Sequence, residues 1–558
     1  MAENVKIVIR EINETTPTGA GVGSDVAYVP GITYSDAGKQ YVNKPVLCSS
    51  ISEFEEYFGA TPYELTAADV SGTNPNKLTA GTPDLSYLYA KELILAGIPV
   101  YYEAIVNIAG ADEAYYNKLK ASRKTLLEAQ IDAEADLKVK SLAITPEDAS
   151  KGITYNNEAY KTKFATDYTT AAADKKAAYD TAKDAALTAS TDVITFNTQY
   201  AVITAGGGYT NISVEVFSDN DDKKQTVSTP KCICDLSAET SRLTYFYNEL
   251  GNHFGVLTDK DEYTVKYITS GGYPTFLIGE DGSAEIGLAS QMLAVAAERG
   301  DAVAIIDHEM DNDAPLAPVS MPDSIYYKVN KTSWANGQYG AMFTPYGTYS
   351  LATYTDNTVV LPASFAYLRC LATAIKTSPN WLAMAGVTRG VVPGLQSINT
   401  RQILSNTIAE EYQPKFGSAS NRVSINAITN IKPYGLTIWG NRTLQTVSET
   451  GTTALNFLNT RNMVSDIKKV VRNAAKTLMF EQDSEVLWNK FKSRIAPTLD
   501  KLKSGFGISD YKILRAEVKP HNGDSLTKGE LGAIIRIYPL YAIEYFDISI
   551  ILSDPDAQ

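Results

Sequence analysis

The densest group of potential metal ligands lies in one short stretch, Asp307-His308-Glu309-Met310-Asp311-Asn312-Asp313. It follows the predicted apolar strand 302–307, and ligand sites of α/β proteins often lie at the carboxyl ends of strands. Its oxygen ligands could hold Ca²⁺ or Mg²⁺, which would suit a metal-dependent hydrolase. The spacing does not match a calcium-binding loop, because the required glycine and distal glutamate are absent. A solvated acidic loop is the alternative interpretation.

Other motifs with possible chemistry are incomplete. The run Gly19–Gly23 lacks the GxGxxG spacing of a dinucleotide loop, and Gly206–Tyr209 lacks the Lys-Ser/Thr pair of a phosphate loop. Cys232 and Cys234 are separated by one residue, which is poor geometry for zinc, and no second pair follows. Cys370 lies in an apolar helical pattern typical of a core residue. We therefore assign no catalytic residue, no metal site and no cofactor.

Composition narrows the class of protein. The chain has 558 residues, 44% of them hydrophobic and 20% charged, which predicts several folded domains. Four Cys exclude a disulfide framework. The formal charge of −14 argues against a surface that wraps nucleic acid. The 35 Tyr, against 16 Phe, suit a protein rich in interfaces, since tyrosine has an apolar body and a polar tip.

Neither a targeting signal nor a membrane span is expected. Lys6, Arg10 and three Glu interrupt the apolar residues of the N-terminus, which is unlike a signal peptide. The longest apolar stretch lies near 93–102 and is about half the length that a bilayer span needs. We expect a soluble chain made in a cytoplasm.

Both ends of the chain have the alternation of a strand. The N-terminal strand is followed by a Gly/Thr/Pro-rich linker over 15–23. The N-terminal strand is interpreted either as a frayed terminus or as an arm that pairs with a sheet elsewhere, including one in another subunit. At both ends, an unpaired apolar edge strand invites pairing with another chain. The residues that share one face are Val5, Ile7 and Ile9 at the start, and Phe546, Ile548, Ile550 and Leu552 at the end.

Residues 111–190 differ in composition from the rest. They contain 19 Ala, one Pro and one Gly among many Lys, Asp and Glu residues. Apolar residues recur at helical spacing, and Thr145-Pro146 is typical of a helix start. The pattern predicts an elongated helical hairpin inserted at the surface. A disordered low-complexity linker is the alternative.

Elsewhere helical and strand patterns alternate, which predicts an α/β fold. The clearest helices lie over 461–503, the second from about Ser484, with Pro497 expected to kink or break it. A hairpin is predicted from 511–519 and 531–538. The segment 461–503 has ten Lys/Arg and five Asp/Glu, a net +5, so the remainder carries −19.

Several motifs, in the same order, resemble the contractile tail sheath family of bacteriophages and related injection machines. They are Val29-Pro30-Gly31-Ile32-Thr33-Tyr34, Glu53–Gly59, Tyr87–Val106, Gly206–Val216, the strand ending at Asp307, and Gly529–Leu552. The most specific is Ile438-Trp439-Gly440-Asn441-Arg442-Thr443-Leu444, which is similar to the family's "vWGaRTl". In Phe480–Trp488, Gln482-Asp483 replaces the family's usual Pro-Asn. The resemblance omits 111–190 and parts of 310–420.

The resemblance implies a mixed α/β (α+β) multidomain subunit that polymerises helically around an inner tail tube and contracts to drive that tube through the host envelope. It implies an inner α/β domain built from both chain ends, outer α/β domains, and strand arms that complete sheets in neighbouring subunits. The domains expected are 1–22 (arm and linker), 23–110 with 191–425 (outer and middle), 111–190 (insertion), 426–540 (inner C-terminal) and 541–558 (arm).

The implied partners are further copies of the chain, the tube protein, and baseplate and tail terminator proteins, with no direct nucleic acid contact and no membrane insertion. The implied location is the virion tail, assembled in the bacterial cytoplasm. The basic segment makes Lys468, Lys469, Arg472 and Lys476 candidates for contact with an acidic tube, although they could equally solvate an outer helix face. The motif residues Trp439, Gly440, Arg442, Thr443 and Trp488 are further candidates. A non-contractile capsid or surface-array subunit, and the hydrolase, remain rival functions.

Overall fold

The computed structural model describes part of the chain in several separate ranges. The described residues are 25–33, 41, 44–62, 64–65, 78–107, 213–217, 224–228, 242–278, 283–310, 325–398, 412–413, 422–447, 453–519, 523–526 and 529–544. The predicted strands at both chain ends, the 111–190 insertion, the two glycine runs and the Cys232/Cys234 pair lie outside these residues.

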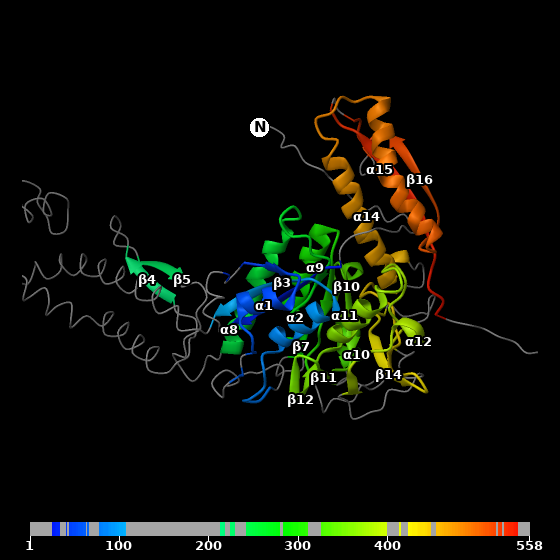
Figure 1. Ribbon diagram of the computed structural model, residues 1–558. Helices are drawn as coiled ribbons and strands as arrows, with labels where there is room; N and C mark the ends of the chain where they lie inside the picture. The colour runs from blue at the N-terminus through cyan, green and yellow to red at the C-terminus, as the bar shows by residue number, and fades with distance from the viewer. Residues whose placement is uncertain are drawn as a thin grey trace, which may run out of the picture.

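An eight-stranded mixed sheet forms the centre of the larger part of the molecule, here called the body (Figure 1). Its central strands are parallel, and the outermost strand at each edge is antiparallel to its neighbour, as is common in large mixed sheets. In spatial order the strands are β15 (Gly435–Ile438), β14 (Asn426–Ile431), β10 (Gly340–Thr344), β9 (Val303–Ile306), β6 (Tyr267–Ile268), β1 (Ala27–Thr33), β3 (Val100–Asn107) and β2 (Val46–Cys48).

Helices cover both faces of this sheet. Neighbouring residues of a strand point to opposite faces. On β3, Tyr102 contacts Ser86 of α2, whereas Glu103 contacts His253 of α8. The helices of the body are α1 (Ile51–Phe58), α2 (Leu85–Ala96), α8 (Arg242–Phe254), α9 (Gly287–Arg299), α10 (Ile325–Lys331), α11 (Ala363–Ala374) and α12 (Gly386–Arg389), with 3-10 turns η2 (Gly255–Thr258), η3 (Gly337–Tyr339) and η4 (Ala454–Asn456).

The described residues also form four smaller sheets, three of which lie before residue 458 in the chain. These three are β12-β11-β13, formed by Tyr354–Leu361, Gly347–Leu351 and Leu395–Ile398; the hairpin of β4 (Ser213–Phe217) and β5 (Lys224–Ser228); and the short pair of β7 (Leu277–Ile278) and β8 (Ala284–Glu285). The predicted α/β class is confirmed. Strands β14 and β15 belong to the main sheet, although the expected boundary at residue 426 assigned them to the C-terminal domain.

The remaining elements form a unit that extends away from the body, here called the projecting domain (Figure 1). It consists of α14 (Leu458–Lys476), α15 (Glu485–Ser504), β16 (Ile508–Ala516) and β17 (Gly532–Pro539). The strands β16 and β17 pair antiparallel, as the predicted hairpin requires. Ser484 caps α15 by accepting a hydrogen bond from the Leu487 N–H.

The sequence predicts a kink or a break at Pro497, and α15 shows no break there. The helix continues through it to Ser504. Pro497 lies on the exposed side, where solvent can bond the carbonyl that loses its helical partner. The apolar side of the same helix packs into a core of its own, which includes Trp488, Phe491 and Leu499.

Candidate functional site

In the acidic stretch after β9, residues 307–309 form hydrogen bonds with neighbouring elements. Asp307 is buried, and its carboxylate accepts hydrogen bonds from the Ser364 hydroxyl at 2.7 Å and from the Ser364 N–H at 3.3 Å. Burial raises the pKa of Asp307 to about 7. His308 lies between the Thr344 hydroxyl and the Glu309 carbonyl. Residues 311–313 lie outside the described residues. In the part of the chain that is described, no group of three or more His, Cys, Asp or Glu could hold a metal ion.

The predicted motif 438–444 forms the link between the sheet and the projecting domain. The Trp439 N–H donates to the Ala427 carbonyl at 2.7 Å. At Gly440 a Cβ atom would lie 2.7 Å from Asn426 Oδ1 and 3.0 Å from Asn426 Cα, so a larger residue would clash with β14. Asn426 Oδ1 accepts from the Arg442 N–H at 2.7 Å, and Asn426 Nδ2 donates to the Arg442 carbonyl at 2.8 Å. These contacts require Gly440 and fix the backbone at Arg442.

Arg442 holds the last described residues of the chain. Its guanidinium is almost fully buried, and Nε lies 2.9 Å from each carboxylate oxygen of Glu544, with a further bond from Nη2. The guanidinium also lies over the Phe457 ring, 5.2 Å from its centroid. Tyr541 contacts the same ring at 5.4 Å between centroids. Thr443 donates from its hydroxyl to the Leu455 carbonyl at 2.7 Å, which keeps Phe457 beside Arg442.

The first described residue is held by a second buried ion group. Lys266 Nζ lies 2.8 Å from Asp25 Oδ1 and 2.7 Å from Asp466 Oδ2. Asn380 donates from Nδ2 to both carboxylates, at 3.1 Å in each case. Burial opposes the charged form of Lys266, but the two carboxylates outweigh it and hold its pKa above the usual range. The group therefore joins the start of β1, the strand β6 and helix α14.

The four basic candidates on α14 lie in two different settings. Lys469 donates to the Val265 carbonyl at 3.1 Å, and burial lowers its pKa to about 8. Lys468 lies 5.6 Å from the centre of the Tyr339 ring. Farther along the helix, Arg472 and Lys476 lie 3.4 Å and 2.5 Å from the exposed carboxylate of Asp261. All four thus meet the body, because Asp261 lies in the turn between η2 and β6, but Arg472 and Lys476 lie nearer solvent than Lys469. Contact of any of them with a tube stays a prediction.

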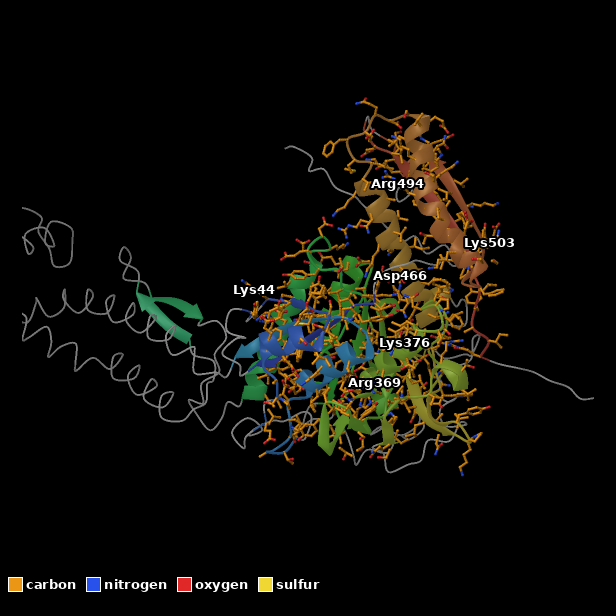
Figure 2. The ribbon with its side chains drawn as sticks, in the orientation of Figure 1. Lys44, Arg369, Lys376, Asp466, Arg494 and Lys503 are labelled. Carbon is orange, nitrogen blue, oxygen red and sulfur yellow. The ribbon has the colours of Figure 1, made fainter. Side chains whose placement is uncertain are left out.

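Further cations lie on α15. Lys490, Arg494, Lys501 and Lys503 are exposed, and Figure 2 shows Arg494 and Lys503 on the projecting domain. Lys503 pairs with Asp510 at 2.8 Å, and Lys492 lies 5.8 Å from the centre of the Trp488 ring. Trp488 itself is buried against Phe491, with 5.7 Å between ring centroids. Trp488 is thus a core residue of the projecting domain.

Sequence reasoning missed the residues that hold the chain ends. Lys266, Asp466, Asp25 and Glu544 were not singled out. For Lys266 and Asp466 a signal was present, since Lys266 interrupts the apolar run from Val265 to Ile268 and Asp466 lies within the helical stretch of α14 that is buried on all sides. A charge inside an apolar run requires a buried partner. The sequence does not identify that partner, because the residues are hundreds of positions apart.

The chain is similar in sequence to a curated protein. This relative is the tail sheath protein of Vibrio phage KVP40, 22% identical over 209 residues, which are 38% of this chain and 29% of that protein. The chain thus matches less than a third of the length of this relative. No protein-family model matches the chain. The match confirms the resemblance to tail sheath proteins that the motifs indicated.

Solved structures of sheath and baseplate proteins have lower sequence identity to this chain. The sheath of the extracellular contractile injection system PVC, in its contracted state, has 11% identity and a TM-score of 0.42, covering 99% of this chain and 98% of that one. The sheath tail protein of Desulfitobacterium hafniense has 9% identity and a TM-score of 0.37, covering 96% of this chain and 100% of that one. A chain of the anti-feeding prophage baseplate in the contracted state has 18% identity and a TM-score of 0.41, covering 58% and 81%.

Proposed function

We propose that the chain is a structural, non-enzymatic subunit of a contractile tail sheath. It polymerises helically around an inner tail tube and contracts to drive the tube through the host envelope. The observation that carries this proposal is the sequence match to a phage tail sheath protein, together with the ordered motifs outside the matched length. The buried side chains of Arg442 and Thr443, and the close approach of Gly440 to Asn426, give the most specific motif a physical basis in the link between two structural units.

Neighbouring copies are joined by strand exchange in this proposal. The sheet β16-β17 has only two strands among the described residues, so each strand has an outer edge with no described partner strand. Such edges accept an added strand through main-chain hydrogen bonds, each worth about 1 kcal/mol net. The alternating segments around Val5–Ile9 and Phe546–Leu552 supply the added strands from other subunits. Leu514 and Tyr538 are exposed apolar side chains that such strands can cover.

The projecting domain faces the tube in this proposal. Arg472 and Lys476 on α14, with the exposed cations of α15, give it a positive surface that suits an acidic tube. Lys468 and Lys469 contact the body of their own subunit and contribute less to this surface.

Baseplate and tail terminator proteins bind the two ends of the sheath. The assembled particle is a virion tail or a related injection machine, formed in the bacterial cytoplasm, and the subunit neither binds nucleic acid directly nor inserts into a membrane. None of the described helices combines the length and apolar content that a bilayer crossing needs.

Negative-stain microscopy of the purified chain tests the assembly. Striated hollow tubes are expected. Flat lattices would indicate the surface-array alternative, and persistent monomers with metal-dependent hydrolysis would indicate the enzyme.

Deletion of residues 1–14 should abolish tubes without lowering the melting temperature of the monomer. Deletion of 111–190 serves as the matched control, because a peripheral insertion should be dispensable for tube formation.

Charge reversal tests the tube-facing surface. Arg472→Glu with Lys476→Glu should weaken binding to the isolated tube and leave sheath polymerisation intact. Lys469→Glu is a poor probe, because it reverses a partly buried charge that contacts the body of the same subunit. Unchanged tube binding by the double reversal, with and without added salt, would count against this orientation.

A further inference from the structure

The two ends of the described chain are held by ion groups with little exposure to solvent. The side chains of Lys266 and Asp25 are 0% and 9% exposed, and those of Arg442 and Glu544 are 5% and 24% exposed. Surface pairs contribute little, but hydrogen bonds between charged groups that are mostly buried are about twice as strong as neutral ones. The first and last described residues of the chain, Asp25 and Glu544, are therefore each fixed by a directional ion pair.

Both ion groups involve one short part of the molecule. Asp466 on α14 shares Lys266 with Asp25. Arg442 lies in a segment that is bonded to the start of the same helix. The Leu458 N–H donates to the Asn441 carbonyl at 3.0 Å, and the Thr443 N–H donates to the Asn456 carbonyl at 2.9 Å. The Asn441 side chain also donates to Asn459 at 2.7 Å. We call residues 441–444 and 456–466 the anchor block.

The anchor block is built to resist sliding. Its part of α14, from Leu458 onward, has no exposed residue, and many of the buried side chains are polar. Asn462 donates to the Tyr367 hydroxyl at 2.8 Å, and the Arg461 guanidinium lies 4.3 Å from the centre of the Tyr339 ring. Apolar contacts tolerate small shifts, whereas a network of hydrogen bonds is lost when its groups move by about an ångström. Figure 2 shows Asp466 at the base of the projecting domain, where α14 meets the body.

We infer that the anchor block is a common attachment for both ends of the chain, and that Asp25 and Glu544 are the residues that position the two arms. This inference rests on the proposed function, in which those ends continue into neighbouring subunits. Tension that enters through one arm then passes through the anchor block to the other arm. It does not have to cross the β16-β17 sheet or the central sheet, so neither is strained while the subunits move.

The test begins with the unassembled chain, so that it does not depend on sheath formation. Hydrogen exchange is followed in peptides that cover 25–33 and 535–544. Asp25→Asn should speed exchange in the first peptide and Glu544→Gln in the second, each by about tenfold or more, the effect of losing a charge-assisted hydrogen bond. Glu92→Gln is the matched control, because it breaks the buried pair with Arg369 and contacts neither chain end. This control should leave both peptides unchanged.

Two outcomes of this measurement overturn the inference. One is unchanged exchange in both peptides. The other is a uniform increase across the whole chain, which would indicate a general stabilising role for the ion groups. Rescue supplies a positive check, since Glu544→Asp keeps the charge and should restore more protection than Glu544→Gln.

Assembly provides the second readout. The double variant Asp25→Asn/Glu544→Gln should need about a tenfold or higher concentration to form tubes than the parent chain or the Glu92→Gln control. Equal assembly concentrations would overturn the role of the anchor. If the parent chain forms no tubes but the exchange of the end peptides responds as expected, the sheath proposal fails while the anchor block stands.

Discussion

The two ends of helix α14 are held by opposite kinds of chemistry. Its first half lies in the body among polar partners such as Lys266, Asn380 and Tyr367. Its second half packs in the projecting domain against an apolar cluster that includes Leu487 and Phe491. One helix thus passes from a hydrogen-bonded region into a separate hydrophobic core. We call the buried group of Lys266, Asp25, Asp466 and Asn380 the junction.

The two halves of α14 have different roles: the apolar core stabilises the projecting domain, and the buried polar contacts fix its orientation. Apolar burial contributes about 25 cal/mol per Å² and depends little on angle, so it is suited to holding the projecting domain together. A buried ion group carries a large desolvation penalty and contributes little net stability, but it is satisfied in only one arrangement. Burial raises the pKa of Asp466 against the opposing effect of Lys266, as expected for a charge in such a site. The junction therefore fixes where the projecting domain points.

The largest expected effect comes from breaking the junction on one side. Lys266→Met leaves Asp25 and Asp466 buried without their cation, which should lower the free energy of unfolding by about 3–5 kcal/mol. The triple variant Lys266→Met/Asp25→Asn/Asp466→Asn removes all three charges and should recover most of that loss. Denaturant titration measures both. If the triple variant is as unstable as the single one, the ion group itself stabilises the fold and the contrast with the apolar core is wrong.

Cavity formation in the projecting domain should have a slightly smaller effect. Leu499 is fully buried, so Leu499→Ala should lower the unfolding free energy by about 2–5 kcal/mol through lost burial and the cavity left behind. The loss should appear in calorimetry as an earlier transition of the projecting domain, with the body melting as before. Leu514→Ala, at a position 44% exposed, is the control. A single shifted transition for the whole chain would show that the two cores unfold together.

The sequence predicted the local elements better than the contacts between them. The helices of the projecting domain and the β16-β17 hairpin follow from apolar periodicity, and Ser484 marks the start of α15 as its type suggests. The break that the sequence allowed at Pro497 does not occur, because a proline on an exposed helix face can leave its freed carbonyl to water. Cys370 was correctly placed in the core.

The contacts at the junction required three-dimensional information. Asp466 and Lys266 are 200 positions apart, and no local pattern pairs them. The motif Trp439–Leu444 was found through resemblance, whereas its physical basis, the fit of Gly440 against Asn426, depends on the approach of two backbones. The basicity of 461–503 was evident from sequence, but the side of α14 that meets the body was not, so Lys469 was grouped with residues nearer solvent.

A third prediction concerns pH. The pKa of Asp307 is about 7 in the fold and near 3.8 when the chain is unfolded, because burial disfavours the carboxylate. The folded chain therefore binds this proton more tightly, and stability should fall as pH rises from about 4 through 7. The expected loss between pH 5 and pH 8 is about 3 kcal/mol. Asp307→Asn should flatten that part of the profile in denaturant titrations.

Asp84 acts in the same direction at lower pH. Burial raises its pKa to about 6. The loss of stability from ionising Asp84 is therefore nearly complete by about pH 6, whereas the loss from Asp307 continues to about pH 7. Asp84→Asn should therefore change the slope mainly below pH 6. An unchanged slope between pH 6 and pH 8 in Asp307→Asn would mean that this carboxylate is not the group responsible. Asp307 would then resemble the exposed carboxylates at the outer half of α14 more than a carboxylate in a dry core.

The smallest effect should come from the exposed pairs at the outer half of α14. Asp261 is 54% exposed and lies beside Arg472 and Lys476, and pairs of this kind contribute less than about 1 kcal/mol. Asp261→Asn should therefore leave the melting temperature nearly unchanged, and any change should vanish in high salt. If the same substitution strengthens binding to an isolated tube, the two cations are available to a partner because their internal pair is weak. A loss of stability as large as that from Lys266→Met would instead mean that the exposed pair also orients the projecting domain, and the division between junction charges and surface charges would not hold.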